Sequence, residues 1–240
     1  MNIIIDKGNS SVKIGLFENN VLIENFSFDN LNEDFLHKII SEFSPQVGIL
    51  SSVGKLDHSI MDFLFFHVTD FYELNNSLPL PIKIDYLTPE TLGADRIAAA
   101  IGAFKEKPDN NLLIIDIGTA ITVDYVSAEG IYKGGNISPG IDLRFRALND
   151  YTDKLPLINE KGDMPDLGYN TETAIRSGVI SGIIRELDSY IDEYKKKQEV
   201  FTFLTGGHSF YFESKLKNSI FADGNLVLKG LNEILNYQYG

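Results

Sequence analysis

One pattern of residues occurs twice in this chain, and it constrains the fold more than any other feature. The segment "IIIDKGNSSVKIGLF" covers residues 3–17, and "LIIDIGTAITVDYV" covers residues 113–126. Each reads as an apolar run, an Asp-x-Gly turn with a small polar residue, and a second strand-like run. A constant offset between the copies aligns three pairs of residues: Asp6 with Asp116, Gly8 with Gly118 and Val21 with Ile131. This agreement predicts two related halves, with chance recurrence of a common turn as the weaker explanation.

Apolar periodicity around the two copies predicts further strands and helices. In the first half we expect strands at 3–5, 12–17, 21–28, 47–53 and 71–74, and helices at 31–43, 59–66 and 89–104. The helix at 89–104 would have Thr88 as its N-cap and Pro89 in its first position. In the second half we expect strands at 112–115, 121–126, 131–136 and 201–204, and helices at 140–151, 171–197 and 225–237. The polar stretch "KEKPDNN" separates the halves, so the predicted domains are residues 1–106 and 107–240.

Composition and charge exclude several classes of protein. The chain has 240 residues, no cysteines and a net charge of −13. Without cysteines it cannot form disulfides, a thiolate nucleophile or a cysteine-ligated metal site. The acidic charge argues against a protein that follows the phosphate backbone of a nucleic acid. No apolar run approaches the roughly 20 residues that span a bilayer, and no signal peptide is evident. We therefore expect a cytoplasmic protein without nucleic-acid or membrane partners.

The repeated turns have residues suited to holding phosphate groups. Glycine lets backbone N–H groups approach an anion closely, and a neighbouring carboxylate suits a hydrated Mg²⁺. Lys13 follows the first turn and can reach a phosphate oxygen, whereas the constant offset puts Val123 at that position of the second copy. Two similar halves would enclose a cleft, which is a usual place for a ligand. A third turn, Thr205-Gly206-Gly207, would let an adenosine lie on bare backbone, although Gly-Gly after a strand is more often a simple turn.

These residues resemble the actin, sugar-kinase and Hsp70 superfamily. In that superfamily two Asp–Gly hairpins grip the phosphates of ATP, and a later Gly-Gly turn contacts the adenosine. The resemblance covers the whole chain and implies an α/β fold. It would consist of two similar actin-like (ribonuclease H-like) halves, each with a mixed sheet flanked by helices, around a central cleft.

The segment between the two copies indicates which family within this superfamily the chain resembles. Gly93-Ala94-Asp95-Arg96 places an acid and a base side by side in the opening turns of a predicted helix. Taken alone, this is most simply a surface ion pair. Together with the duplicated turns, however, it resembles type III pantothenate kinase. The ordered set that carries this resemblance comprises Asp6–Lys13, Gly93–Arg96, Asp116–Thr122, Gly134–Gly140, Leu155-Pro156 and Asn170-Thr171. Ser10 departs from the family, which more often has Thr there, but it keeps the hydroxyl.

The resemblance implies ATP-dependent phosphorylation of the primary hydroxyl of pantothenate to 4'-phosphopantothenate, the first step of coenzyme A biosynthesis. Asp95 would be the base that takes the hydroxyl proton. Asp116 would bind a monovalent cation, K⁺ or NH₄⁺. The residues that would bind ATP are Asp6, Lys7, Gly8, Asn9, Ser10, Ser11, Val12, Lys13 and Thr119. The residues that would bind the substrate are Tyr86, Gly93, Ala94, Asp95, Arg96 and Thr171.

The family also implies a homodimer, with the strand at 134–140 and the following helix as candidates for the dimer face. Three alternatives remain on the same fold: an ATPase or other small-molecule kinase, an ATP-binding regulator, and an inactive relative that acts in transcription control. Asp95 and Arg96 discriminate between these readings, because a regulator needs no base aimed at an acceptor hydroxyl. His208 follows the Gly-Gly turn and is the one histidine close to an expected site, but a contact with nucleotide is the less favoured reading.

Overall fold

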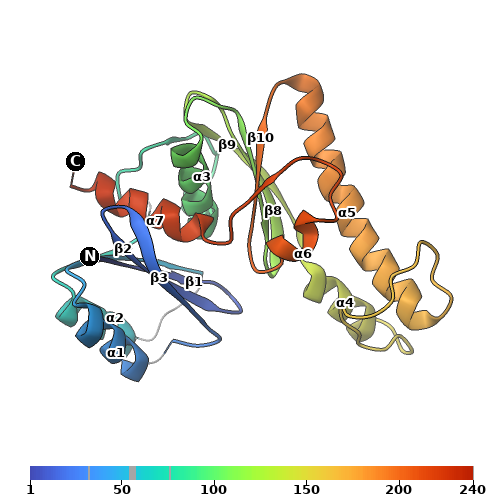
Figure 1. Ribbon diagram of the computed structural model, residues 1–240, viewed down its shortest axis with the longest axis horizontal. Helices are drawn as coiled ribbons and strands as arrows, with labels where there is room; N and C mark the ends of the chain where they lie inside the picture. The colour runs from blue at the N-terminus through green and yellow to red at the C-terminus, as the bar shows by residue number, and fades with distance from the viewer. Residues whose placement is uncertain (32, 54–57, 76, 240) are drawn as a thin grey trace. The chain divides into compact units, whose positions relative to one another are not determined.

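The structure of the protein is a computed structural model that describes residues 1–31, 33–53, 58–75 and 77–239 (Figure 1). The backbone divides into two compact units. The first unit comprises Met1–Asn110, Tyr125–Gly134 and Asn225–Gly240, and the second comprises Asn111–Asp124 and Gly135–Gly224. Both units are therefore discontinuous in sequence, because the chain crosses between them more than once. The predicted division at residues 106 and 107 stays a prediction.

A mixed five-stranded sheet forms the centre of the first unit. Its strands are β1 (Asn2–Lys7), β2 (Val12–Glu18), β3 (Val21–Phe28), β4 (Val47–Ser52) and β5 (Asp70–Glu73), in the order β3-β2-β1-β4-β5. The hairpin strands β1, β2 and β3 are antiparallel to one another, whereas β4 is parallel to both β1 and β5. The central strand β1 carries three fully buried isoleucines, as its continuous apolar run predicts.

Helices cover both faces of this sheet. Helices α1 (Glu33–Phe43) and α2 (His58–His67) pack on one face, where Leu36 and Leu64 join the cluster that contains Ile3 and Ile5. Helices α3 (Ala94–Glu106) and α7 (Leu226–Tyr237) contact β4 and β1 as well as each other. Because residues of a strand alternate between faces, β1 serves both layers at once. Residue 32 of the predicted helix at 31–43 lies outside the described residues.

The predicted helix at 89–104 begins later than its sequence pattern indicates. Pro89–Thr91 forms a short 3₁₀ helix, and Thr88 makes no side-chain cap hydrogen bond. Leu92 is extended, Gly93 is the N-cap, and α3 starts at Ala94. The predicted start at Pro89 was therefore wrong, because a proline at the first position suits a 3₁₀ turn as well as an α-helix. The correction places Asp95 in the first turn of α3.

Helices α3 and α7 approach closely because small residues line their contact. A Cβ atom on Gly230 would overlap the carbonyl oxygen of Ala98, and one on Gly102 would overlap that of Leu226. Asparagines then fix α7 to the sheet: Asn2 donates to the side chain of Asn232 at 2.8 Å, and Asn236 donates to that of Asn20 at 2.7 Å. The C-terminal helix is thus an integral layer of the first unit.

The second sheet has six strands in the order β11-β10-β7-β8-β9-β6. They are β6 (Lys83–Ile84), β7 (Leu112–Ile117), β8 (Ala120–Val126), β9 (Ile131–Pro139), β10 (Phe201–Thr205) and β11 (Phe221–Ala222). β7 and β11 are both parallel to β10, and β6 is parallel to β9. Strands β8 and β9 each contribute residues to both units. The sheet begins with a repeat of the β1–β2–β3 meander, as the duplicated pattern predicts.

Helices α4 (Ile141–Asp150), α5 (Thr171–Lys197) and the short α6 (Ser209–Glu213) complete the second unit. Ile115, Ile121 and Phe145 share its apolar core with Ile180 and Ile183 of α5. A reciprocal cap fixes the start of α5, since Thr173 N–H donates to Asn170 Oδ1 at 2.8 Å and Asn170 N–H donates to Thr173 Oγ1 at 3.1 Å. The predicted α/β class with mixed sheets flanked by helices is confirmed.

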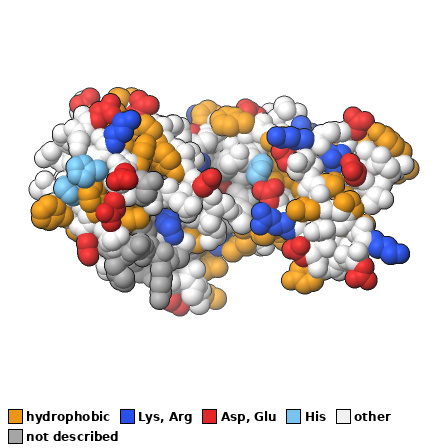
Figure 2. All heavy atoms as spheres, turned by 90° about the horizontal axis from the view of Figure 1, so that it is seen from below, with side chains coloured by type: hydrophobic (Ala, Val, Ile, Leu, Met, Phe, Trp, Pro, Cys, Tyr) orange, Lys and Arg blue, Asp and Glu red, His pale blue; other side chains and the backbone are white. Residues whose placement is uncertain are grey.

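No helix among the residues described is long and apolar enough to cross a membrane. On the face shown in Figure 2, lysine and arginine side chains are dispersed among acidic ones and do not gather into one continuous patch.

Candidate active site

The first Asp–Gly turn connects β1 to β2 through residues 8–11. Gly8 N–H donates to Ser11 C=O at 2.9 Å, which closes the turn. The strand register places Asp6 opposite Lys13 and Lys7 opposite Val12. Asn9 and Ser10 are exposed at the tip. A Cβ atom on Gly8 would make only an ordinary contact, 3.4 Å from Ser11 C=O, so packing does not require glycine here.

Asp6 lies beside Asp95, so the fold brings the first turn and the Gly-Ala-Asp-Arg element together. Burial, and after it the nearby carboxylate of Asp95, raise the pKa of Asp6 from 3.8 to about 6, while Lys13 and the hydroxyl of Ser51 act to lower it. The residue as a whole is partly exposed, but its Oδ1 is buried. Asp95, which is distant in sequence, thus lies near Asp6 and its hairpin partner Lys13 at the carboxyl end of β1.

The Gly-Ala-Asp-Arg element forms the first turn of α3. Asp95 Oδ1 accepts a hydrogen bond from Arg96 N–H at 2.8 Å, so its carboxylate folds back over the helix N-terminus. The partial positive charge there stabilises an anionic side chain. A Cβ atom on Gly93 would lie 2.5 Å from Asp95 Oδ1, and glycine therefore leaves the room that this conformation needs. Arg96 is buried, with 7% of its surface exposed.

Tyr86 is held by a strand that the sequence did not reveal. β6 pairs with β9 in the register Lys83–Ile131 and Ile84–Tyr132, and Asp85 N–H donates to Tyr132 C=O at 2.9 Å. The Tyr86 ring then lies 3.4 Å from the position of a Cβ atom on Gly134. Its ring meets that of Tyr132 edge to face at 6.2 Å. Two residues of strand thereby fix an aromatic side chain that we expect to contact substrate.

The second Asp–Gly turn is tighter than the first. Gly118 N–H donates to Ala120 C=O at 3.0 Å, two residues on, whereas Gly8 bonds to a residue three positions on. The constant offset that aligns Lys13 with Val123 therefore fails beyond the glycine. If the two copies are aligned instead by the residues whose carbonyls close the turns, Ser11 and Ala120, the offset is shorter by one residue. This alignment places Lys13 opposite Thr122. The second copy still has no lysine at this place.

Two glycine-containing segments pack around the second turn. Gly140 N–H donates to Thr119 C=O at 3.0 Å, and a Cβ atom on Gly140 would overlap Gly118 C=O. On the other side, Gly206 has a φ of +93°, and a Cβ atom there would overlap Asp116 Oδ1. The second unit thus brings the predicted cation residue Asp116 and the predicted adenosine turn together.

Some residues at these turns remain open to a ligand. A Cβ atom on Gly207 would meet nothing within 4 Å, and one on Gly118 would meet only ordinary contacts at 3.5 Å or more. His208 follows Gly207 and donates its backbone N–H to Ile117 C=O at 3.1 Å. Its Nδ1 is buried and has no hydrogen-bond partner among the residues described. Thr171 is exposed at the first position of α5, where the Asn170 cap fixes its backbone.

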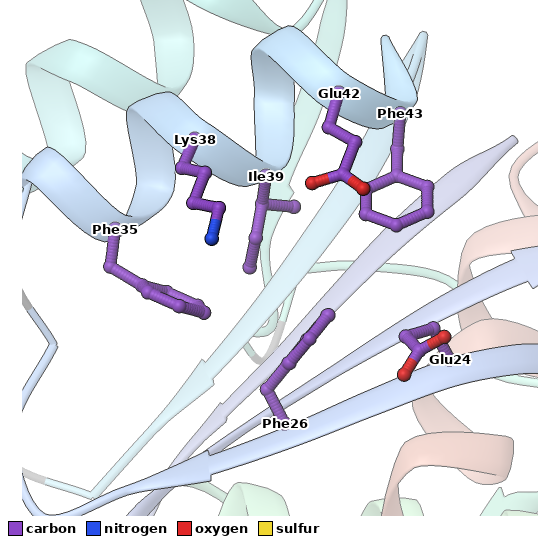
Figure 3. A pocket seen from close by; sticks show the side chains of 7 residues that line it. All are labelled: Glu24, Phe26, Phe35, Lys38, Ile39, Glu42 and Phe43. Atoms are coloured by element: carbon purple, nitrogen blue, oxygen red, sulfur yellow. The ribbon is translucent and has the colours of Figure 1, made fainter.

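A cavity of about 270 Å³ in the first unit lies away from these residues, between β3 and α1 (Figure 3). Its walls are apolar in the middle and charged at the rim, and they consist of Glu24, Phe26, Phe35, Lys38, Ile39, Glu42 and Phe43. The rings of Phe26 and Phe35 meet edge to face at 5.6 Å. None of the residues that the sequence predicts for the site lines this cavity, so it does not carry the predicted chemistry.

Sequence comparison identifies the family. The family model described as type III pantothenate kinase matches residues 2–193 of this chain. A protein of Azobacteroides pseudotrichonymphae genomovar. CFP2 with the name type III pantothenate kinase is 55% identical over 238 residues, which are 99% of this chain and 97% of that protein. The chain belongs to the type III pantothenate kinase family. The predicted family, and with it the prediction of a phosphotransferase that acts on pantothenate, is thereby confirmed.

Solved structures support the same fold at lower identity. A Campylobacter jejuni protein described as a Baf family transcriptional activator is 22% identical, with a TM-score of 0.63 over 99% of this chain and 98% of that one. A Listeria monocytogenes protein described as an N-acetylmannosamine kinase is 15% identical, with a TM-score of 0.52 over 100% and 99% of the two chains. These likenesses concern the fold alone. They confirm the predicted α/β architecture with mixed sheets flanked by helices.

Proposed function

We propose that this chain transfers the γ-phosphoryl group of ATP to the primary hydroxyl of pantothenate, with Asp95 as the base. The observation that carries this proposal is that the carboxylate of Asp95 lies near enough to Asp6, in the first unit, to raise its pKa. One acid belongs to the phosphate turn and the other begins a helix, so phosphate and acceptor would be held side by side. Phosphoryl transfer requires mainly positioning and charge stabilisation, with one group to accept the hydroxyl proton.

Asp95 suits the role of base because its surroundings hold its carboxylate in place. The bond from Arg96 N–H holds Oδ1 in place, and the carboxylate would accept the proton of the pantothenate hydroxyl. The helix N-terminus stabilises the ionised carboxylate before the reaction. Arg96 would bind the carboxylate of pantothenate, since a guanidinium pairs with a carboxylate in a fixed, two-pronged geometry. Tyr86 and Thr171 would contact the remainder of the substrate.

The residues near Asp6 fit a hydrated Mg²⁺. Asp6 Oδ1 is buried without a hydrogen-bond partner among the residues described, and Asp95 adds negative charge beside it. In the described part of the chain, no group of three or more acidic or histidine side chains is placed to hold a metal ion. This matches Mg²⁺, which keeps several waters and binds through one or two carboxylates and the phosphates. When bound, the ion would neutralise phosphate charge, and Asp6 would hold it.

Asp116 would hold a monovalent cation, K⁺ or NH₄⁺. Its carboxylate lies against the backbone of Gly206 and beside the carbonyl-rich second turn. A carboxylate with backbone carbonyls is a hard oxygen donor set of the kind that such cations take. The cation would supply positive charge in the unit that has no counterpart of Lys13.

The remaining contacts with ATP would lie at the glycines where an added Cβ atom would have room. Gly8, Asn9 and Ser10 would bind the phosphates through backbone N–H groups and side chains, with Lys7, Ser11, Val12 and Lys13 around them and Thr119 on the second turn. The surface at Gly207 would accept the adenosine. Because Gly8, Gly118 and Gly207 are not required by packing, room for a ligand is the physical reason that remains for glycine there.

A homodimer is supported by exposed apolar side chains on and after β9. Ile137 is 64% exposed, Leu143 on α4 is 40% exposed and Tyr151 is 88% exposed. On α5, Cβ atoms at Gly178 and Gly182 would meet nothing within 4 Å. Glycine in a helix costs about 0.5–1 kcal/mol relative to alanine, so these two positions favour a second chain packed close to the helix. The cytoplasmic location and the absence of nucleic-acid partners stay predictions from sequence.

A panel of acceptors tests the proposed function. Purified protein with ATP, Mg²⁺ and K⁺ should release ADP when pantothenate is added and not with a panel of sugars. Equal release of ADP with no acceptor would instead identify an ATPase. Retained ATP binding without turnover on any acceptor would identify an ATP-binding regulator.

A further inference from the structure

The carboxyl ends of β1 and β4 lie next to each other at the first turn. These strands are parallel, and their register pairs Asp6 with Ser51 and Lys7 with Ser52. The ladder continues past the strand end, since Val53 N–H donates to Lys7 C=O at 2.9 Å. Register partners in a sheet project their side chains to the same face. Ser51 therefore shares a face with Asp6 at the end of the sheet where the phosphate turn begins.

Ser51 is buried in a way that packing alone does not explain. None of its surface is exposed, and its Oγ has no hydrogen-bond partner among the residues described. Burying an unpaired hydroxyl costs about 1–3 kcal/mol, which an alanine would avoid. The neighbouring Oδ1 of Asp6 is buried and unpaired in the same sense. An unpaired donor thus lies beside an unpaired acceptor, and a small rotation about the serine χ1 would join them.

We propose that Ser51 is a positioning residue whose hydroxyl donates to the Asp6 carboxylate and fixes its orientation toward the phosphates of ATP. This inference rests on the proposed function, in which Asp6 would hold the hydrated Mg²⁺ that accompanies the phosphates of ATP. A hydrogen bond from a fixed hydroxyl would hold one carboxylate oxygen and leave the other free for the ligand. The hydroxyl of Ser51 also acts to lower the pKa of Asp6, against burial and Asp95, which raise it.

Three substitutions separate positioning from packing. Ser51→Ala removes the hydroxyl, Ser51→Thr keeps it, and Ser127→Ala is the control, because Ser127 is a buried serine in the same unit whose hydroxyl also has no partner among the residues described. Calorimetry gives the dissociation constant of ATP, steady-state kinetics give both KM values, and thermal unfolding gives the midpoint. We expect Ser51→Ala to weaken ATP binding about tenfold or more, as for a hydrogen bond to a charged group. Its KM for pantothenate should stay unchanged and its midpoint should not fall, and Ser51→Thr should bind ATP like the unaltered protein.

A double-mutant cycle decides the result even if threonine does not fit the buried site. In an Asp6→Ala background, Ser51→Ala should cause no further loss of ATP affinity, because the hydroxyl acts through the carboxylate. An equal loss in both backgrounds, or a loss matched by Ser127→Ala, would overturn the proposal. If Asp6→Ala itself leaves ATP affinity unchanged, the proposed role of Asp6 fails. If Asp6→Ala weakens binding and Ser51→Ala does not, only the role of Ser51 fails.

Discussion

The two Asp–Gly turns begin with the same residues and are supported in different ways. The first turn has exposed residues at its tip, and its acid meets a second acid, Asp95, and a lysine. The second is closed one residue earlier and is packed between the backbones of Gly140 and Gly206. A shared pattern therefore specifies the strand, the acid and the glycine. The neighbours contributed by the rest of each unit decide what the acid does.

The largest effect on activity should follow substitution of Asp95, the second acid that lies near the first turn and has no counterpart at the second. Asp95→Asn keeps the shape of the side chain and its bond to Arg96 N–H, but it removes the proton acceptor. We expect kcat to fall by about 10²–10⁴, the range for general base catalysis, while the affinity for ATP changes little. Rapid-quench or steady-state assays measure the first quantity, and calorimetry measures the second. An unchanged kcat would remove Asp95 from the mechanism.

The next effect concerns the free energy of unfolding, which should depend on pH because the pKa of Asp6 is raised in the folded protein. Because the folded pKa of about 6 exceeds the ordinary value of 3.8, folding favours protonated Asp6. The resulting stability is fully present below about pH 4 and is lost as the pH rises through 6. Ionised Asp6 then costs at most about 3 kcal/mol. Without nucleotide, Asp6→Asn should be more stable than the unaltered protein at pH 8, by urea unfolding, and this difference should shrink toward pH 4. A difference that does not vary with pH would contradict the burial of this carboxylate.

Gly8 of the first turn and Gly206, which packs against the second turn, should respond to alanine in opposite ways. Gly206→Ala forces a left-handed backbone and an overlap with Asp116, so it should reduce the free energy of unfolding by about 1–3 kcal/mol. Gly8→Ala has room in the fold and should change stability little, but it should weaken ATP binding by crowding the phosphates. Thermal unfolding and calorimetry on the two variants test this. A destabilised Gly8→Ala protein with normal ATP affinity would show that glycine serves the fold at both of these positions.

The smallest effect should distinguish the proposed cation ligand, Asp116, from the proposed phosphate ligand, Lys13. Asp116→Asn should raise the K⁺ concentration for half-maximal activity about tenfold, since it removes one charged ligand. Lys13→Met should raise the KM for ATP and leave the K⁺ dependence as it is. Titrations of K⁺ at saturating substrate measure both responses. A parallel change in the two variants would contradict the assignment of the cation to the second unit.

The sequence predicted the long elements well because their signals are local. α5 begins at Thr171 and ends at Lys197, as predicted, since an asparagine cap and a run of lysines mark its ends. β1 and β7 were recognisable as continuous apolar runs. The short strand β6, by contrast, has two residues and exists only because β9 supplies its partner, so no periodicity could reveal it. The way in which β6 positions Tyr86 could therefore not be predicted from the sequence.

The candidate site residues that belong to a motif could be proposed from the sequence, whereas those that only the sheet brings together could not. Asp6 and Asp95 were identified from their motifs, but their proximity results from the packing of α3 on β4 and is invisible in sequence. Ser51, which we propose as a positioning residue, was not singled out from the sequence because it precedes no glycine and belongs to no motif. The signal that would have found it is its place at the carboxyl end of a strand parallel to β1. In α/β sheets this edge is where ligands bind.

Analysis of the reaction product tests the central claim most directly. After incubation of the protein with ATP, Mg²⁺, K⁺ and pantothenate, phosphorus NMR with mass spectrometry identifies what has been phosphorylated. We predict one new phosphate ester, on the primary hydroxyl of pantothenate, formed in equal amount with ADP and lost in Asp95→Asn. ADP formed alongside unmodified pantothenate, or a phosphate ester that Asp95→Asn produces just as fast, would contradict the account.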